Sequence, residues 1–337
     1  MTWTPGAAEG LRRAPAGRLR GVLGGRPTRT PGPARRLRGA LAGLVVALVV
    51  TACGSNGPSG ALSGSSTGVP VRVIATTTIF ADIVRNVGGS CVSVDSIVPP
   101  GVGPEDYEPR PDDARRIADA QLIVSNGVGL DNFLDKLLAA NSSSAPRLVL
   151  GDGIPTIDVG GRPNPHFWLD PALVRTDYVP AIEAKIETLA PACATTIRSS
   201  SAAYAKQLAD LDAELLARVA TIPAANRTLV TSHDAFPYFA RHFGFRVIGV
   251  IVANVGQEPS AADLATLVNT IKSAGVRAIF SEAQFSPKLA QTLAAEAGVQ
   301  TVVSDLLTDA LGPNGETYLS LMRWDVNRVV NALTGGS

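Results

Sequence analysis

Residues 192–220 read ACATTIRSSSAAYAKQLADLDAELLARVA, a long stretch that contains neither proline nor glycine. Its bulky apolar side chains recur at helical spacing, as Tyr204, Leu208, Leu211, Leu215 and Val219. This spacing predicts one helix on the order of 40 Å long, at a rise of about 1.5 Å per residue. Pro223 follows and ends the helix. A rigid helix of that length reaches across a whole domain, so it determines how the flanking segments are connected.

Short apolar runs alternate with helical patterns on both sides of this long helix. Before it, we expect helices at residues 80–87 and 130–140 and strands at residues 71–75, 91–98, 122–124 and 148–150. After it, we expect strands at residues 228–231, 247–252, 278–280 and 299–303, with helices at 235–243, 261–274, 286–297 and 319–333. Such alternation predicts parallel sheets that are covered on both faces. The predicted fold class is α/β, with two doubly wound α/β lobes joined by a single long rigid helix.

The N-terminus has the pattern of an export signal. Arg35-Arg36-Leu37-Arg38 precedes a short apolar run at residues 40–50, and small residues follow. This order predicts a signal peptide rather than a membrane span. Val50-Thr51-Ala52-Cys53 resembles a bacterial lipobox, in which the cysteine is lipidated and becomes the mature N-terminus. The alternative is a plain secretory signal with an incidental Cys53, and the long basic region leaves open a start codon downstream of Met1.

The basic charge of the chain is concentrated in this signal. The whole chain has 30 basic and 29 acidic residues, and nine arginines and Glu9 precede Cys53, which leaves 21 basic against 28 acidic residues. An acidic folded part argues against nucleic-acid binding, which needs a basic surface, and suits a cationic ligand. Residues 54–70 are rich in glycine and serine, which predicts a flexible tether.

Four polar residues occupy loop positions where a metal ion can bind. His166 lies in the proline-stiffened loop PNPHFWLDP (residues 163–171), and His233 lies between a predicted strand and a predicted helix. Glu105 and Asp305 also follow predicted strands, and ligands in open α/β sheets bind beyond the carboxyl ends of strands. Two neutral imidazoles and two carboxylates balance a divalent cation. The pattern predicts one metal site in the cleft between the lobes.

Other polar residues near these loops have expected supporting roles. Glu282 follows the predicted strand at 278–280 and is a candidate carboxylate that orients a ligand from behind. Asp170, Asp234 and Asp309 are interpreted as helix caps or similar supporting groups. His242 is interpreted as a residue of a helix C-terminus rather than as a ligand.

The same residues leave several functions open. Four ligands close a tetrahedral zinc site, whereas bidentate carboxylates give five or six contacts and suit manganese. A metal-dependent enzyme is an alternative of another class, since two histidines and a carboxylate can hold catalytic iron or zinc. Against it, the chain has no nucleophile paired with a base and no phosphate-binding loop. A binder of an organic ligand and a role in cell adhesion are further alternatives.

Four stretches of the chain carry a family resemblance. They are PPGVGPEDYEPRPDDARRIADAQLIVSNGVGLDNFLDKL (99–137), NPHFWLDP (164–171), VTSHDAFPYFARHFGF (230–245) and SDLLTDALGPNGETYLSLMRWDVNRVV (304–330). In this order they resemble the metal-binding lipoproteins of bacterial zinc/manganese ABC importers. The resemblance implies two lobes bridged by a long helix, with the metal in the cleft. It also implies permease and ATPase partners, no enzymatic activity, and a lipid anchor as the only membrane attachment.

The resemblance also implies a ligand set. The family usually has histidine as its first ligand, before Tyr-Glu-Pro, and Glu105 stands at that position here. His166 and His233 match the second and third ligands, the latter as in zinc-type members, and Asp305 is matched to the fourth. Zn²⁺ is therefore the expected ion. Mn²⁺ or Fe²⁺ are alternatives, because the composition of two histidines and two carboxylates equals the manganese set. The His-rich loop of many zinc members is also absent.

The expected organisation has five parts. These are a signal peptide (1–52), a lipid-anchored flexible linker (53–70), an N-terminal lobe (71–190), the linking helix (191–221) and a C-terminal lobe (222–335). We expect a monomer on the extracytoplasmic face of the cell membrane. Cys91 and Cys193 can pair outside the cell, but two buried thiols fit the sequence equally well.

Overall fold

The computed structural model describes residues 68–105, 107–140, 143–252, 256 and 258–335. The predicted signal peptide, the lipobox with Cys53 and most of the tether lie outside the described residues. Within the described ranges, no helix combines the length and the apolar character needed to cross a membrane.

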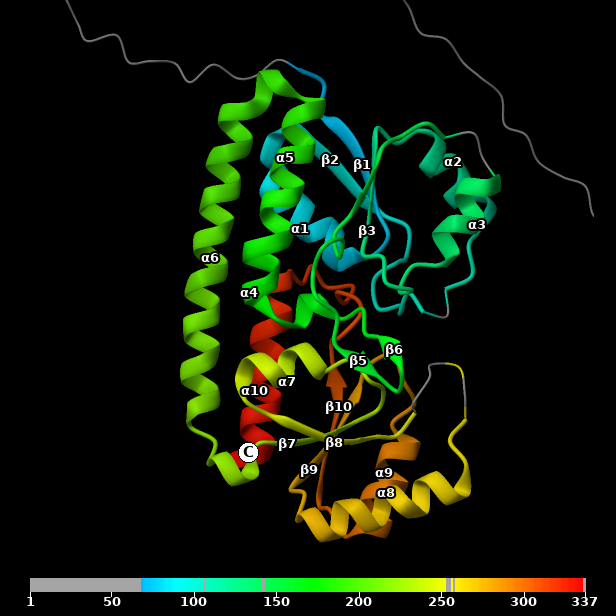
Figure 1. The fold of residues 1–337 in the computed structure, drawn as a ribbon, viewed down its shortest axis with the longest axis vertical. Helices are drawn as coiled ribbons and strands as arrows, with labels where there is room; N and C mark the ends of the chain where they lie inside the picture. The colour runs from blue at the N-terminus through cyan, green and yellow to red at the C-terminus, as the bar shows by residue number, and fades with distance from the viewer. Residues whose placement is uncertain (1–67, 106, 141–142, 253–255, 257, 336–337) are drawn as a thin grey trace, which may run out of the picture. The chain divides into compact units, whose positions relative to one another are not determined.

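The N-terminal half is built on one parallel sheet. Its strands are β1 (Val71–Ala75), β2 (Val92–Ser96), β3 (Leu122–Ser125) and β4 (Arg147–Val149), in the spatial order β2-β1-β3-β4 (Figure 1). Successive residues of β1 face opposite sides, since Val73 packs in the cluster with α1 (Thr78–Gly88) and Ile74 packs with Ile117 and Leu134. The latter residues belong to α2 (Pro111–Ala118) and α3 (Phe133–Ala140), so helices cover both faces and the doubly wound prediction is confirmed for this half.

Capping groups mark the starts and the ends of several helices. Thr77 accepts a hydrogen bond from the Phe80 amide at the start of α1, and Pro111 is the first residue of α2. Gly244, Gly275 and Gly298 adopt φ values of 72°, 61° and 77° after three helices of the C-terminal half. A side chain with a Cβ is strained in this left-handed region, so glycine there sets the direction in which the chain leaves each helix.

The C-terminal half contains two pairs of parallel strands. β7 (Thr228–Thr231) pairs with β8 (Arg246–Val250), and β9 (Ala278–Glu282) pairs with β10 (Thr301–Leu306). β7 lies beside β9, and the Ser232 hydroxyl donates to the Ser281 hydroxyl at 2.6 Å just beyond β7. The helices of this half are α7 (Pro237–Phe243), α8 (Ala261–Ala274), α9 (Lys288–Ala297) and α10 (Tyr318–Thr334).

Short elements complete the chain between β4 and the long helix. They include the antiparallel hairpin β5 (Asp158–Val159) and β6 (Arg162–Pro163), the 3₁₀ turn η2 (Phe167–Leu169), α4 (Pro171–Leu173) and the π-helical turn η3 (Val174–Tyr178). α5 (Val179–Leu189) and η4 (Pro191–Cys193) then lead into the long helix, and η5 (Ala224–Asn226) follows it. The turn η1 (Gly89–Cys91) precedes β2.

The predicted linking helix is present as α6 (Ala194–Ala220), 27 residues long (Figure 1). It packs against α1 and α5 in the N-terminal half and against α10 in the C-terminal half. One continuous apolar cluster therefore includes residues from both halves, among them Phe80, Leu208 and Val326. A disulfide between Cys91 and Cys193, with Cα atoms 6.2 Å apart, fastens the start of α6 to the N-terminal sheet.

Candidate metal centre

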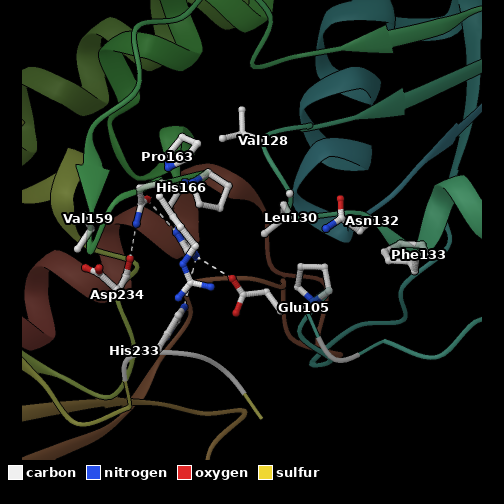
Figure 2. Close-up of a pocket in the computed structure, with 15 residues that line it drawn as sticks. Glu105, Val128, Leu130, Asn132, Phe133, Val159, Pro163, His166, His233 and Asp234 are labelled. Carbon is white, nitrogen blue, oxygen red and sulfur yellow. Dashed lines mark hydrogen bonds and ion pairs between the residues drawn. The ribbon is translucent and has the colours of Figure 1, made fainter. Parts of the chain in front are cut away.

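Four loops bring polar side chains to one point. Glu105 lies between β2 and α2, and His166 lies directly before η2. His233 follows β7, and Asp309 follows β10. Both imidazoles and the Asp309 side chain are buried, and Glu105 is 25% exposed. Figure 2 shows His166, His233 and Glu105 converging on the same region.

The ligand atoms lie close enough to share one ion. His166 Nε2 and His233 Nε2 are 3.3 Å apart. Asp309 places Oδ1 at 3.6 Å from His166 Nε2 and Oδ2 at 3.4 Å from His233 Nε2. Glu105 Oε1 is 3.8 Å from His166 Nε2. Nitrogen and carboxylate donors at these separations form a set that suits a divalent transition metal.

Asp305 does not join this cluster, and its assignment as a ligand is corrected. Its side chain is 40% exposed and pairs with Arg328, while its backbone oxygen accepts from Trp324 Nε1 at 2.8 Å. The reason is the length of β10, which runs on to Leu306, so Asp305 still lies within the strand. Asp309 is the carboxylate beyond the strand end. In the sequence, the apolar residues Leu306 and Leu307 after Asp305 indicate that the strand continues past Asp305.

A neutral amide orients His166. Asn164 Oδ1 lies 3.0 Å from His166 Nδ1 and accepts from the His166 amide at 3.1 Å, which leaves Nε2 facing the cluster. Asn164 Nδ2 donates to the backbone oxygen of Asp234 at 2.6 Å. This contact ties the His166 loop to the segment that carries His233. The loop is also held by Asn126, which donates to the Pro165 oxygen at 2.9 Å.

A buried carboxylate lies behind His233. Glu282, at the end of β9, has no exposed surface and places Oε1 at 3.2 Å from His233 Nδ1. The position matches the supporting role expected for Glu282, since a carboxylate on the second nitrogen directs Nε2 toward a metal. His242 lies elsewhere, in the last turn of α7, 3.1 Å from Asp170 and 2.5 Å from Asp212.

The Asp309 loop is held from both halves of the chain. Trp168 Nε1 donates to the Thr308 oxygen at 2.7 Å, and Gln284 Nε2 donates to Asp309 Oδ2 at 2.6 Å. Because Trp168 and His166 share one loop, the bond from Trp168 to Thr308 fixes the position of Asp309 relative to His166. The sequence does not predict Trp168, Gln284 or Asn164 as supporting groups.

Burial and charge give the two histidines opposite proton affinities. Burial lowers the pKa of His166 well below its usual value, and the neighbouring His233 lowers it further. Burial also opposes charge on His233, but Asp309 and Glu282 outweigh it and raise its pKa to about 10. Burial raises the pKa of Asp309 to about 7, against the lowering effect of His233. The metal-free cluster therefore holds a proton on His233 at neutral pH, and a cation that binds there displaces it.

Two buried carboxylate oxygens of the cluster, Glu282 Oε2 and Asp309 Oδ1, lack hydrogen-bond partners within the described part of the chain. His233 Nδ1 and Glu282 Oε1 face each other at 3.2 Å and form an ion pair when His233 is protonated. Leaving the two unpartnered oxygens buried costs about 1–3 kcal/mol each. A bound cation offsets this cost for Asp309, because Asp309 Oδ1 would then contact the positive charge of the ion.

Residues 73–332 match a family described as the periplasmic component A of the zinc-uptake complex. The chain belongs to this family. The matched residues include both lobes and α6. Curated relatives include the manganese-binding lipoprotein MntA of Halalkalibacterium halodurans, which is 29% identical over 86% of this chain and 96% of the relative. The iron-binding protein YfeA of Yersinia pestis is 32% identical over 79% of this chain and 87% of its own length.

Solved structures of metal-binding proteins have the same fold as this chain. The periplasmic zinc-binding protein TroA of Treponema pallidum superposes with a TM-score of 0.73 at 28% identity. The alignment covers 79% of this chain and 99% of that protein. The predicted fold class and the predicted family are both confirmed.

Proposed function

We propose that this protein is the extracytoplasmic metal receptor of an ABC-type importer and that it captures one divalent transition metal ion, zinc by preference. The proposed ligands are Glu105, His166, His233 and Asp309. The observation that carries the proposal is the convergence of two buried imidazole nitrogens and a buried carboxylate on one point. These donors come from loops of both halves, so the ion is held between the lobes.

The ligand separations favour zinc. A tetrahedral ion with bonds of about 2.1 Å sets its ligands about 3.4 Å apart. Octahedral coordination at a similar bond length brings adjacent ligands to about 3.0 Å. The separations among the ligand nitrogens and oxygens run from 3.3 Å (His166 Nε2 to His233 Nε2) to 3.8 Å (His166 Nε2 to Glu105 Oε1), nearer the tetrahedral spacing.

Manganese or iron(II) is the second candidate in the same class of receptor. Relatives named for manganese and for iron are 29% and 32% identical to this chain. Two imidazoles and two carboxylates also accept six-coordinate ions when the carboxylates bind through both oxygens. Glu105 is the most exposed of the four groups, so it has the freedom to change its binding mode.

We infer a binding role rather than catalysis. Four protein donors leave a tetrahedral ion without the open position that a catalytic zinc needs for water. The family consists of transport components, which supports the same inference. Metal that is retained without turnover of ester or phosphoester substrates is the expected result, and turnover lost on metal removal would favour an enzyme instead.

The proposed placement is a monomer anchored at the outer face of the cell membrane through lipidated Cys53. Removal of the signal peptide (1–52) leaves the linker (53–70) as the tether of the two lobes, 71–190 and 222–335, joined by 191–221. Relatives named as lipoproteins support this placement. Permease and ATPase subunits are the proposed partners that receive the ion.

We propose that release depends on small movements of the ligand loops. α6 contacts helices of both halves, and the apolar cluster runs through both, so a wide hinge opening would expose that cluster. Small-angle scattering of the metal-free and metal-bound protein should give nearly equal radii of gyration. A large compaction on binding would contradict this mechanism.

The test of the function is metal content with competition. The protein is stripped with chelator, then offered zinc, manganese and iron(II) at equal free concentrations. We expect one equivalent of zinc that manganese does not displace, lost in His166→Ala and His233→Ala. Preferential retention of manganese or iron(II) moves the substrate but keeps the receptor, and no retained metal overturns the proposal.

A further inference from the structure

A cavity much larger than a metal ion lies beside the candidate centre. Its volume is about 400 Å³, within the range of small-molecule pockets. His166, His233 and Glu105 line it, so an ion bound to them presents a face to this space. Figure 2 shows the cavity between these residues and Val128, Leu130 and Phe133.

Two charged side chains of opposite sign line the cavity. Arg162 projects from β6, and Asp234 follows His233. Among the described residues, none forms an ion pair or a side-chain hydrogen bond with the Arg162 guanidinium or with the Asp234 carboxylate. Nearby Asn164 binds only the backbone oxygen of Asp234. Charged groups that line a cavity unpaired are available to a ligand.

The charge balance limits what that ligand can be. A divalent ion is offset by Glu105 and Asp309, and Glu282 is buried behind His233 and does not line the cavity. The other charges that line the cavity are one positive charge at Arg162 and one negative charge at Asp234. A ligand of zero net charge with a separate anion and cation matches this arrangement. The remaining walls include apolar side chains, from Val128, Leu130, Phe133 and Val159.

We propose that the cavity binds a free α-amino acid beside the metal, with its carboxylate on Arg162, its ammonium group on Asp234 and its side chain toward the ion and the apolar wall. This inference rests on the proposed function, because the ion forms one wall of the site. The guanidinium and the carboxylate each make charge-assisted hydrogen bonds to a partner of opposite sign. The protein thereby carries its metal together with an amino acid that packs beside the ion, while the four protein donors stay in place.

The experiment is equilibrium dialysis of the full chain in detergent, loaded with one equivalent of zinc, against radiolabelled L-histidine and L-leucine. Labelled acetate tests binding of an anion alone. Each sample is also assayed for bound zinc. The variants are Arg162→Gln and Asp234→Asn, with Arg277→Gln as the control, since Arg277 is exposed and lies outside the cavity.

We expect one equivalent of amino acid per zinc, with affinity lowered about tenfold or more in each cavity variant and unchanged in the control. Acetate should bind at least tenfold more weakly than either amino acid. Zinc retained without amino acid, or amino-acid binding unaffected by both variants, overturns this inference and leaves the metal receptor standing. Protein that retains no zinc overturns the proposed function itself.

Discussion

The sharpest test of the metal centre compares two aspartates that are four residues apart. Asp309→Ala removes a buried carboxylate that lies 3.4 Å from His233 Nε2 and 3.6 Å from His166 Nε2. Asp305→Ala removes the same chemical group from an exposed position beside Arg328. The pair therefore separates loss of a ligand from loss of a negative charge in this segment.

The expected effects differ by orders of magnitude. Zinc held by four protein ligands is bound by about 10–16 kcal/mol, so one ligand accounts for roughly 3 kcal/mol. At about 1.4 kcal/mol per factor of ten, Asp309→Ala weakens binding about a hundredfold or more. Asp305→Ala should change affinity by no more than about twofold, because a half-exposed ion pair contributes about 0–1 kcal/mol and makes no contact with the cluster.

Competition between the protein and a fluorescent zinc chelator at pH 7.5 measures both affinities. Circular dichroism of the metal-free variants checks that each retains the fold. Equal affinities for the two variants, with the fold intact, would refute the placement of Asp309 at the ion. A hundredfold loss in Asp305→Ala would restore the assignment that the sequence alone suggests.

Four further predictions concern Glu282, the proton on His233 and the disulfide. Glu282→Gln should lower zinc affinity about 10–100-fold in the same competition assay, because it weakens the hold on His233, while the exposed control Glu296→Gln should not. Zinc affinity should rise about tenfold per unit between pH 7 and pH 9, because His233, with a pKa of about 10, must release one proton. The metal-free protein should meanwhile lose stability to heat from about pH 6.5 toward pH 10, since a raised histidine pKa stabilises the fold only while the proton is bound; a flat profile would contradict the raised pKa. Cys91→Ser with Cys193→Ser should lower the free energy of unfolding by about 4.7 kcal/mol in denaturant titrations, for a closed loop of about 100 residues, without loss of zinc stoichiometry.

The elements with strong local patterns are the ones that the sequence predicts well. The helical spacing from Tyr204 to Val219 predicts α6, and Gly275 and Gly298 predict the ends of α8 and α9. These features depend on nearby residues only. The pairing of the C-terminal strands depends on contacts between distant segments, and the irregular register between β7 and β8 leaves no pattern in either strand alone.

The candidate site shows the same division. His166 and His233 follow from their loops, because histidine is rare in this chain, His166 lies in a proline-rich loop and His233 follows an apolar run. The choice between Asp305 and Asp309 depends on whether β10 ends before or after Leu306, and strand ends are hard to place from composition. The pairing of Cys91 with Cys193 needs the distance between their Cα atoms, which only the packing of α6 against the N-terminal sheet determines.

The apolar cluster that runs from β1 through α6 to α10 has a consequence for protein engineering. The two halves are not interchangeable modules, because a chimera of lobes from two relatives would place unmatched side chains along the whole length of α6. Close packing tolerates such mismatches poorly. Metal preference is therefore best altered by grafting the four ligand loops onto an unchanged scaffold.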